Sequence, residues 1–354
     1  MSPIVLIVAG DPNQFTGGYI YDQRIADALK EAGHSIDIVG LAGRFPEADA
    51  TAADAMADTL ASLPDDVHVV IDGLALGTLG ETVSAHRGGR RVTALVHHPL
   101  ADEAGLDEAS ARHLYDSERH ALAGVDHVIV TSAFTARRLR ERYAVPATRL
   151  SIVEPGVAAP AQDIRPRSAP PRRLLCIATL IPRKGHADLV TALAELADTD
   201  WVCDCIGDTR RDPAHTEAIE RAIAAAGLTG RIRLHGAQPP EALTRAYAEA
   251  DLFVLPSHYE GYGMVVTEAV SHGLPVVTTT GGALADTLPA EAGLAVAPGE
   301  PSALAAALEQ CLKEPAVYAG LVAGARRAAA SLADWPRAGQ LFAAALADNP
   351  EIHA

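Results

Sequence analysis

The chain has 354 residues, of which 49% are hydrophobic and 21% are charged, a balance typical of soluble globular enzymes with room for two domains. Its formal net charge of −16 argues against a nucleic acid partner, because a long polyanion would be repelled. No stretch approaches the roughly 20 uninterrupted apolar residues of a membrane-spanning helix. We therefore expect a cytoplasmic protein that binds no nucleic acid and does not insert stably into a membrane.

Short apolar runs alternate with amphipathic segments along the N-terminal half. The predicted strands are Ile4–Ala9, Ser35–Val39, Val67–Ile71, Arg91–His97 and His127–Thr131, and the predicted helices are Tyr21–Ala32, Asp107–Ala123 and Ser132–Tyr143. Fully apolar short strands that alternate with helices indicate a parallel sheet covered on both faces. No basic segment precedes the run Ile4–Ala9, which predicts a first core strand and not a signal peptide.

Residues 154–173 hold several prolines and little periodicity, which is typical of a connection between domains. A second alternating series follows. Its predicted strands are Leu174–Ala178, Trp201–Ile206, Ile232–His235, Leu252–Leu255 and Pro275–Thr278, and its predicted helices are Ala187–Leu196, Asp212–Ala226, Pro240–Glu249, Met264–Ser271 and Ser302–Lys313. The fold class is therefore α/β, with two Rossmann-like doubly wound domains expected to face a cleft. We assign residues 1–160 to the first domain, 161–172 to a linker, 173–333 to the second domain and 334–354 to a terminal helix.

The four cysteines are not spaced as a metal or redox motif. Cys203 and Cys205 are separated by one residue, which suits neither a zinc knuckle nor a redox CxxC pair. Cys176 and Cys311 lie, like the other two, in apolar surroundings. We expect reduced, packed thiols and no metal site built from cysteine.

A glycine-containing loop, Gly10-Asp-Pro-Asn-Gln-Phe-Thr-Gly-Gly18, follows the first strand and leads into a helix. Gly17 and Gly18 permit close backbone approach to donor phosphates or to an acceptor. The loop lacks the GxGxxG spacing, which argues against a nicotinamide site. Tyr19 and Asp22, just beyond it, are candidate acceptor-binding residues or, equally, residues of the helix surface.

The stretch Asp251-Leu-Phe-Val-Leu-Pro-Ser-His-Tyr-Glu-Gly-Tyr-Gly-Met-Val-Val-Thr-Glu268 concentrates the chemistry of the C-terminal half. A strand is predicted to end near Ser257, and a helix to start near Gly263 or Met264. The free amides at a helix start form an anion site. Two carboxylates, Glu260 and Glu268, flank this position with seven residues between them.

This Glu-X7-Glu pattern after Leu-Pro-Ser resembles the signature of retaining GT-B glycosyltransferases of the family 4 type (glycosyl transferases group 1). Further segments continue the resemblance in order. They are Ala178-Thr-Leu-Ile-Pro-Arg-Lys-Gly-His186, Arg231-Ile-Arg-Leu-His-Gly236, Gly273-Leu-Pro-Val-Val, Gly281-Gly282 and Ala292-Gly-Leu-Ala-Val-Ala-Pro-Gly299. The N-terminal half matches more loosely, as expected where acceptors differ.

The resemblance implies roles for particular residues. Glu260 would contact the hydroxyls of the donor sugar, Glu268 would bind the ribose, and Lys184 would neutralise the diphosphate. The implied donor-binding set is Gly17, Gly18, Arg183, Lys184, Gly236, Gly261, Tyr262, Gly263, Met264, Val265 and Glu268. In the family, a histidine at the end of a strand contacts the transferred sugar. The segment His-Pro-Leu-Ala favours His98 for that role over His97, although a histidine that caps the strand is an equal alternative. The implied catalytic set is therefore His98, Lys184 and Glu260.

Two positions depart from the family pattern. Many relatives carry a phosphate-binding arginine five positions before the lysine, where this chain has Thr179. Arg183 is the candidate replacement. Relatives often have a glutamate after the Gly-Gly pair, where Ala285 and Asp286 stand here. Asp102 and Glu103, which follow His98 closely, are further candidates for acceptor binding, and Trp335 is expected to anchor the terminal helix on the first domain.

The resemblance implies transfer of a hexose-type sugar, with retention, from a UDP- or GDP-sugar to a hydroxyl acceptor. The nucleotide sugar is a co-substrate, and neither a cofactor nor a catalytic metal is expected. A soluble small molecule or oligosaccharide is favoured as acceptor, because no strongly basic amphipathic face suits a membrane surface. A nucleotide-sugar epimerase or hydrolase, a phosphorylase, and a non-catalytic binding protein on the same fold stay open. The sequence indicates neither the identity of donor and acceptor nor the oligomeric state.

Overall fold

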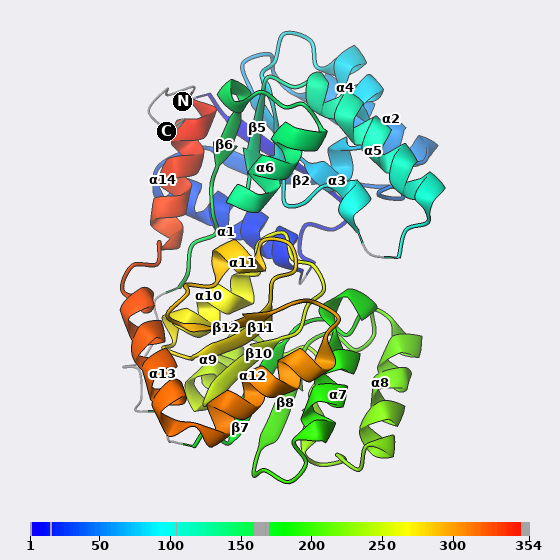
Figure 1. Ribbon diagram of the computed structural model, residues 1–354. Coiled ribbons are helices and arrows are strands. Elements are labelled where there is room, and N and C mark those ends of the chain that lie inside the picture. Colours follow the sequence, from blue (N-terminus) through cyan, green and yellow to red (C-terminus); the bar gives the residue numbers. More distant parts are fainter. Residues whose placement is uncertain (1, 15, 104, 159–166, 168–169, 348–354) are drawn as a thin grey trace. The chain divides into compact units, whose positions relative to one another are not determined.

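The computed structural model describes residues 2–14, 16–103, 105–158, 167 and 170–347. The chain divides into two compact units (Figure 1). Unit 1 comprises residues 1–156 and 333–354, and unit 2 comprises residues 157–332. Most of the predicted linker, 161–172, lies outside the described residues.

Unit 1 is built on one six-stranded parallel sheet with the order β2-β1-β3-β4-β5-β6. Its strands are β1 (Ile4–Ala9), β2 (Ile36–Leu41), β3 (His68–Asp72), β4 (Val92–Val96), β5 (His127–Val130) and β6 (Leu150–Ile152). The strand order reverses at β1, which lies between β2 and β3. The loops after β1 and β3 therefore leave the sheet at the reversal point, where doubly wound sheets bind ligands.

Unit 2 repeats this plan with the order β12-β11-β10-β7-β8-β9. Its strands are β7 (Arg173–Ile177), β8 (Val202–Ile206), β9 (Ile232–Leu234), β10 (Leu252–Leu255), β11 (Val276–Thr279) and β12 (Gly293–Val296). Here the order reverses between β7 and β10, which pair directly through Phe253 and Leu175. The two Rossmann-like α/β sheets predicted from the sequence are thereby confirmed.

Helices cover both faces of each sheet (Figure 1). In unit 1 they are α1 (Gly17–Glu31), α2 (Ala50–Ser62), α3 (Gly73–Leu76), α4 (Gly80–His86), α5 (Glu108–Ala123), α6 (Ala133–Arg142) and α14 (Trp335–Leu346). In unit 2 they are α7 (His186–Glu195), α8 (Pro213–Ala225), α9 (Pro240–Glu249), α10 (Met264–Ser271), α11 (Leu284–Thr287), α12 (Pro301–Lys313) and α13 (Pro315–Ala329). All six residues of β1 are buried, as expected for a strand covered on both faces.

Several elements were not predicted from the sequence. The strands β6 and β12 are short and lie at sheet edges, so they carry little periodic signal. The helices α2 and α13 are rich in alanine, which blurs the contrast between apolar and polar faces. The second strand lies at Ile36–Leu41, shifted from the predicted Ser35–Val39.

The terminal helix α14 belongs to unit 1 and packs against α1. The Trp335 ring meets the Tyr21 ring edge-on at 5.9 Å. Gly339 lies so close to Ala28 that an added Cβ would come within 2.7 Å of the alanine methyl group. Small residues thus let the two helix backbones approach closely. Within the described residues, no helix is long and apolar enough to cross a membrane.

Candidate functional site

Lys184 and Glu260 lie in the two loops that leave the sheet of unit 2 at its reversal point. Lys184 ends a short turn, Pro182–Lys184, after β7, and Glu260 follows β10. Gly185 has a φ of 69°, and a Cβ on it would stand 2.1 Å from the Pro256 carbonyl oxygen. Only glycine allows both this backbone conformation and this approach. The glycine therefore brings the lysine loop against the glutamate loop.

The side chains of these loops converge on the Glu260 carboxylate. The Lys184 Nζ donates a hydrogen bond to Glu260 Oε1 over 2.5 Å, and Ser257 Oγ donates to the same oxygen over 2.7 Å. A guanidinium nitrogen of Arg183 lies 3.6 Å from Glu260 Oε2 and donates to the Tyr259 carbonyl over 2.6 Å. The structure thus brings together three residues that the sequence predicted, and adds Ser257, which the Leu-Pro-Ser motif contained without an assigned role.

Burial raises the pKa of Glu260, but the charges of Lys184 and Arg183 and the hydrogen bonds from Lys184 and Ser257 outweigh it and lower the pKa below its ordinary value. Glu260 is therefore ionised near neutral pH. Two cations and one carboxylate leave the cluster with one excess positive charge. An anion such as a diphosphate would be attracted here, and a buried carboxylate would accept hydrogen bonds from neighbouring hydroxyls.

The backbone of Glu260 is fixed by the loop after β11. Its N–H donates to the Gly281 carbonyl over 3.3 Å, and its carbonyl accepts from the Ala283 N–H over 2.8 Å. Gly282 has a φ of 65°, and a Cβ there would lie 2.2 Å from the Glu260 carbonyl oxygen. The Gly-Gly pair is therefore a steric requirement for holding Glu260 in place.

Helix α10 starts directly after Gly263, which has a φ of 92°. The first amides of a helix, here from Met264 and Val265 onward, have no partner within the helix and favour a negative charge. Gly261 and Tyr262 form the turn that leads to this end, and the Tyr262 carbonyl accepts a hydrogen bond from the Thr287 hydroxyl over 2.6 Å. The predicted anion-binding loop thus follows the same strand as Glu260.

Glu268 lies further along α10 and is half-buried. The Tyr247 hydroxyl, from α9, donates to its Oε2 over 2.8 Å. Gly236 follows β9 with a φ of 68°, and its carbonyl accepts from the Gly207 N–H over 3.1 Å. A Cβ on Gly207 would lie 1.9 Å from the Ala178 carbonyl oxygen. Sequence reasoning missed Tyr247 and Gly207, although Gly207 directly follows a predicted strand.

In unit 1, the predicted Gly17 and Gly18 open helix α1. An added Cβ on Gly18 would lie 3.1 Å from the His97 ring, so the histidine rests on the glycine. The Tyr19 hydroxyl donates to the Ala9 carbonyl, at the end of β1. Tyr19 therefore holds the start of α1 against the sheet.

His97, Asp22 and Asp72 form a cluster in unit 1. His97 Nε2 lies 3.2 Å from Asp22 Oδ1 and 3.5 Å from Asp72 Oδ2. Burial, and then repulsion from Asp22, raises the pKa of Asp72 to about 7, although His97 lowers it. Burial lowers the pKa of His97, but Asp22 and Asp72 raise it above its ordinary value overall. Asp72 was missed in the sequence, although an acid directly after a predicted strand is a usable signal.

His98, the histidine favoured from the sequence, is separate from this cluster. Its Nε2 lies 3.2 Å from Glu103 Oε2, and both side chains are partly exposed. Asp102 is buried instead against Arg138 of α6, whose Nε donates to its carboxylate over 2.7 Å. The His98–Glu103 pair is thus open to solvent, whereas Asp102 holds the loop to α6.

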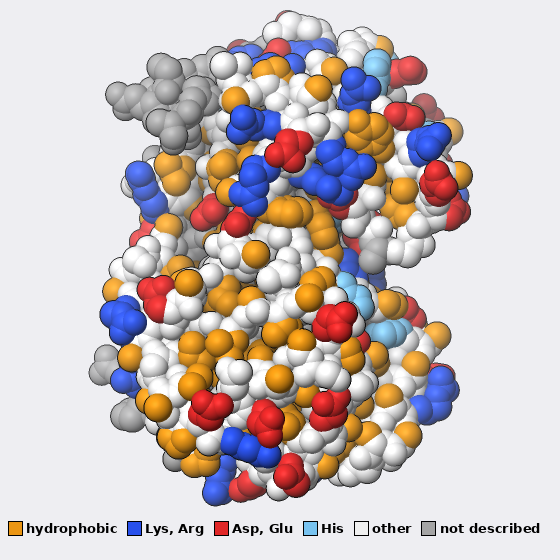
Figure 2. Space-filling model, viewed as in Figure 1, with side chains coloured by type: hydrophobic (Ala, Val, Ile, Leu, Met, Phe, Trp, Pro, Cys, Tyr) orange, Lys and Arg blue, Asp and Glu red, His pale blue; other side chains and the backbone are white. Residues whose placement is uncertain are grey.

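The basic stretch 137–142 lies on α6. Figure 2 shows Lys and Arg side chains gathered in this region of unit 1. Arg137, Arg140 and Arg142 are exposed, so this stretch is largely a solvated helix face. Arg138 differs because it is partly buried in the ion pair with Asp102.

A buried glutamate holds the loop that carries these histidines. Glu118 on α5 is 1% exposed, and its Oε2 accepts from the Leu100 N–H over 3.0 Å. Burial raises the pKa of Glu118 to about 8, although the nearby Tyr143 hydroxyl and the Leu100 N–H act in the opposite direction. The acid is therefore mainly protonated at neutral pH in the folded chain.

This raised pKa predicts that the chain loses stability as the pH rises. An unfolded glutamate ionises near pH 4.5, so between about pH 5 and pH 8 only the folded chain retains the proton of Glu118. Within that interval, each rise of one pH unit lowers the free energy of unfolding by about 1.4 kcal/mol. The contribution of Glu118 to stability is fully present below its pKa in the unfolded chain. It is lost as the pH rises through its pKa in the folded chain.

The variant Glu118→Gln keeps an acceptor for the Leu100 N–H and removes the ionisation. We expect urea unfolding of this variant at about pH 5 and pH 8 to show a smaller loss of stability than the wild type. Glu108→Gln, an exposed position on the same helix, serves as the control and should retain the wild-type slope. Equal slopes in Glu118→Gln and the wild type would contradict the assignment.

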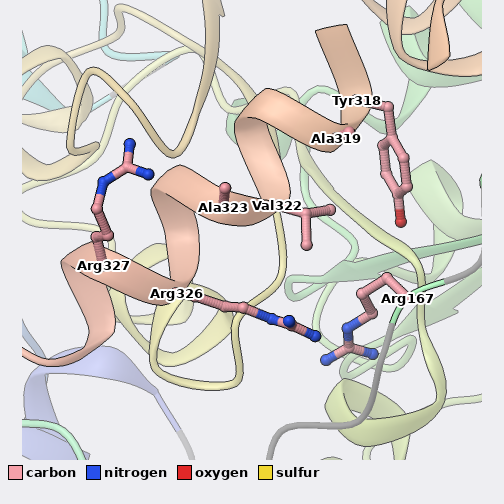
Figure 3. Close-up of a pocket in the computed structure, with 7 residues that line it drawn as sticks. All are labelled: Arg167, Tyr318, Ala319, Val322, Ala323, Arg326 and Arg327. Carbon is pink, nitrogen blue, oxygen red and sulfur yellow. The ribbon is translucent and has the colours of Figure 1, made fainter. Parts of the chain in front are cut away.

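A cavity of about 430 Å³ lies elsewhere on unit 2, beside α13. Arg326 extends from this helix towards Arg167 (Figure 3). Arg167 donates to the carbonyls of Ala248 and His272 over 2.9 and 2.7 Å, so its side chain contacts the ends of α9 and α10. No residue of the predicted donor-binding set lines this cavity.

Comparison with known proteins gives two family matches in chain order. Residues 66–159 match the family described as Glycosyltransferase Family 4, and residues 171–314 match the family described as Glycosyl transferases group 1. The matches thus fall one in each unit, and the second contains both Lys184 and Glu260.

Two curated relatives are similar to this chain. An MMP alpha-(1->4)-mannosyltransferase of Mycolicibacterium hassiacum is 26% identical over 82% of this chain and 72% of its own length. A D-inositol 3-phosphate glycosyltransferase of Thermomonospora curvata is 29% identical over 68% of this chain. This chain spans only 60% of the length of that second relative.

Solved structures share the complete fold. A sucrose-phosphate synthase of Thermosynechococcus elongatus superposes with a TM-score of 0.80 at 22% identity, over 97% of this chain and 100% of that one. The Anabaena protein HepE in complex with UDP and glucose superposes with a TM-score of 0.76 at 18% identity, over 98% and 100% of the two chains. The solved structures thus share the GT-B fold of two parallel sheets, and the two family matches fit a glycosyltransferase of the family 4 type.

Proposed function

We propose that this protein is a retaining glycosyltransferase that moves a hexose-type sugar from a UDP- or GDP-sugar to a hydroxyl acceptor. The observation that carries the proposal is the cluster of Lys184, Arg183 and Glu260 at the reversal point of the unit 2 sheet, with Glu260 on the loop that leads to the start of α10. This combination offers two cations and helix amides to a diphosphate. It offers a buried, ionised carboxylate to the hydroxyls of a sugar.

In the proposed site, Lys184 and Arg183 stabilise the leaving diphosphate. Their charges are held by the protein before the reaction starts, so little reorganisation is needed as negative charge grows on the leaving oxygen. Arg183 takes the place of the family arginine that is missing at Thr179. Its side chain is mostly buried and already reaches the carboxylate that Lys184 contacts, which supports this substitution.

Glu260 positions the sugar, and Glu268 binds the ribose of the nucleotide. In the structure, Lys184 donates a hydrogen bond to Glu260. When the donor binds, the Lys184 ammonium group would share its hydrogen bonds between the Glu260 carboxylate and the phosphate. The acceptor hydroxyl enters on the face of the departing diphosphate, whose oxygen takes its proton. This route needs positioning and charge stabilisation but no separate base, and we propose no metal ion at the diphosphate.

The acceptor is proposed to be a soluble small molecule or an oligosaccharide, with a cytoplasmic enzyme acting on it. His98 and Glu103 are proposed to face the transferred sugar and the acceptor, because both are partly exposed and lie in the loop after β4. The names of the two relatives above refer to mannosyl transfer and to an inositol phosphate. Such soluble polyhydroxyl compounds are therefore the first acceptors to test.

The test is incubation of the full chain with UDP- and GDP-hexoses and a panel of polyhydroxyl acceptors, followed by NMR of the product. We expect release of nucleoside diphosphate that depends on the acceptor, and an anomeric configuration equal to that of the donor. Turnover of the donor without any acceptor would indicate an epimerase or hydrolase instead. A product with inverted configuration would contradict the retaining mechanism.

A further inference from the structure

We propose that Asp22, Asp72 and His97 form a binding site in unit 1 for one divalent transition-metal ion. The three residues come from α1, the end of β3 and the segment after β4. The sequence does not predict this site, because no third candidate ligand lies near His97 and His98 at a spacing typical of a metal-binding motif. Only the strand order β1-β3-β4 brings the three side chains together.

The ligand atoms are spaced as the corners of a coordination shell. The two carboxylate oxygens lie 3.2 and 3.5 Å from His97 Nε2, and all three atoms lie within 4.8 Å of one another. An ion with bonds of about 2.0–2.2 Å keeps neighbouring ligands about 2.8–3.1 Å apart in an octahedron and about 3.3–3.6 Å apart in a tetrahedron. The two nitrogen–oxygen spacings therefore fit neighbouring ligands of one ion.

Hydrogen bonding alone explains the arrangement poorly. An imidazole nitrogen carries at most one hydrogen, yet His97 Nε2 faces two carboxylates. The contact with Asp22 Oδ1 over 3.2 Å is a hydrogen bond, but the 3.5 Å between His97 Nε2 and Asp72 Oδ2 exceeds the usual N–H···O range of about 2.7–3.2 Å. Asp22 and Asp72 are only 3% and 6% exposed, so water screens their mutual repulsion weakly. A divalent ion would satisfy both carboxylates and the imidazole at once.

The surroundings hold the three ligands in position. Asp72 uses its other oxygen, Oδ1, to accept from the Leu74 N–H over 3.0 Å at the start of α3, which leaves Oδ2 directed at His97. The His97 ring meets Tyr21 edge-on at 5.3 Å and rests on Gly18. Metal ligands are typically oriented by such outer contacts. The His97 side chain keeps 18% of its surface exposed, so an ion can enter from solvent.

The donor set selects a class of ion. One imidazole nitrogen and two carboxylate oxygens suit Zn²⁺, Mn²⁺, Fe²⁺ or Co²⁺, whereas Mg²⁺ and Ca²⁺ prefer oxygen alone. Two carboxylates and a neutral imidazole would give an uncharged complex with such an ion. Burial of the two carboxylates without an ion costs free energy because their negative charge is poorly solvated. In the complex with the ion this charge is neutralised, so the cost is removed.

The experiment is a titration of the full chain, first treated with a chelator, with Zn²⁺ and Mn²⁺ by calorimetry and with Co²⁺ by visible absorption. We expect one ion per chain and a Co²⁺ spectrum that reports nitrogen ligation. Asp22→Asn and Asp72→Asn preserve the side-chain shape, and the amide oxygen introduced by Asp72→Asn can still accept from the Leu74 N–H. Each should weaken binding by at least about 100-fold, because even outer contacts of metal ligands are worth about 10- to 100-fold.

The matched control is His98→Gln, which alters the adjacent histidine and should bind the ion as the wild type does. Failure of all three ions to bind below millimolar concentration would overturn the proposal, as would wild-type affinity in Asp22→Asn. If the asparagine variants do not fold, crystals of the wild-type chain grown with the ion provide the test. An anomalous X-ray signal at these three residues would support the proposal, and its absence there would overturn it. Nucleotide binding measured with the chelator present tests the donor site of unit 2 separately, so either proposal can fail alone.

Discussion

Replacing Lys184 with alanine is expected to weaken the binding of nucleoside diphosphates by about 10- to 100-fold. A hydrogen bond to a charged group contributes about 1.5–3 kcal/mol, and about 1.4 kcal/mol corresponds to a factor of ten in affinity. The loss also leaves Glu260 with Arg183 as its only cation among the partners described above, so the pKa of Glu260 should rise. Calorimetric titration of the wild type and the variant with UDP and GDP measures the effect.

The control for this variant is Lys313→Ala. Lys313 lies on α12 in the same unit, is exposed, and contacts Glu309 over 2.9 Å. Its removal changes the net charge equally, so a general electrostatic effect would appear in both variants. Unchanged nucleotide affinity in Lys184→Ala, in a chain with wild-type stability, would show that the diphosphate is bound elsewhere.

Replacing Gly185 with alanine is expected to lower the free energy of unfolding by roughly 2–4 kcal/mol and to abolish nucleotide binding. An alanine at a φ of 69° costs about 1–2 kcal/mol. The rest arises because its Cβ would stand 2.1 Å from the Pro256 carbonyl oxygen, so the backbone itself has to move. Lys184 is the preceding residue, and its ammonium group would move away from Glu260 with the loop. Urea unfolding and nucleotide titration together measure both effects.

Gly227→Ala separates the conformational cost from the steric one. Gly227 has a φ of 70°, almost the same as Gly185, but nothing lies within 4 Å of the position that a Cβ would take. We expect it to lose only about 1–2 kcal/mol of stability and to bind nucleotide normally. Equal destabilisation in both variants would mean that the contact with Pro256 does not constrain the loop.

Much of the cluster around Glu260 could be predicted from the sequence, because its residues directly follow apolar strands. The ends of the strands before Lys184 and Glu260 were predicted within a few residues, and glycines marked the loops. The contact between the two side chains could not be predicted. It depends on β10 lying beside β7, although β8 follows β7 in the chain.

The predicted acceptor-binding residues of unit 1 show where such reasoning stops. Asp102 looked available for a ligand, but Arg138, 36 residues further on, pairs with it inside unit 1. Asp72 followed a predicted strand and was overlooked, because its partners Asp22 and His97 are distant in sequence. Residue types and spacing identify groups that follow a strand, whereas long-range pairing decides which of those groups are already engaged.

The central claim is that unit 2 binds a nucleoside diphosphate through the cluster of Lys184, Arg183 and Glu260. The most direct test is calorimetric titration of the full wild-type chain with UDP, GDP and ADP in the presence of a chelator. We predict saturable binding of one of them that needs no metal ion and is weakened in Lys184→Ala but not in Lys313→Ala. Absence of binding by every nucleoside diphosphate up to millimolar concentration would contradict the claim.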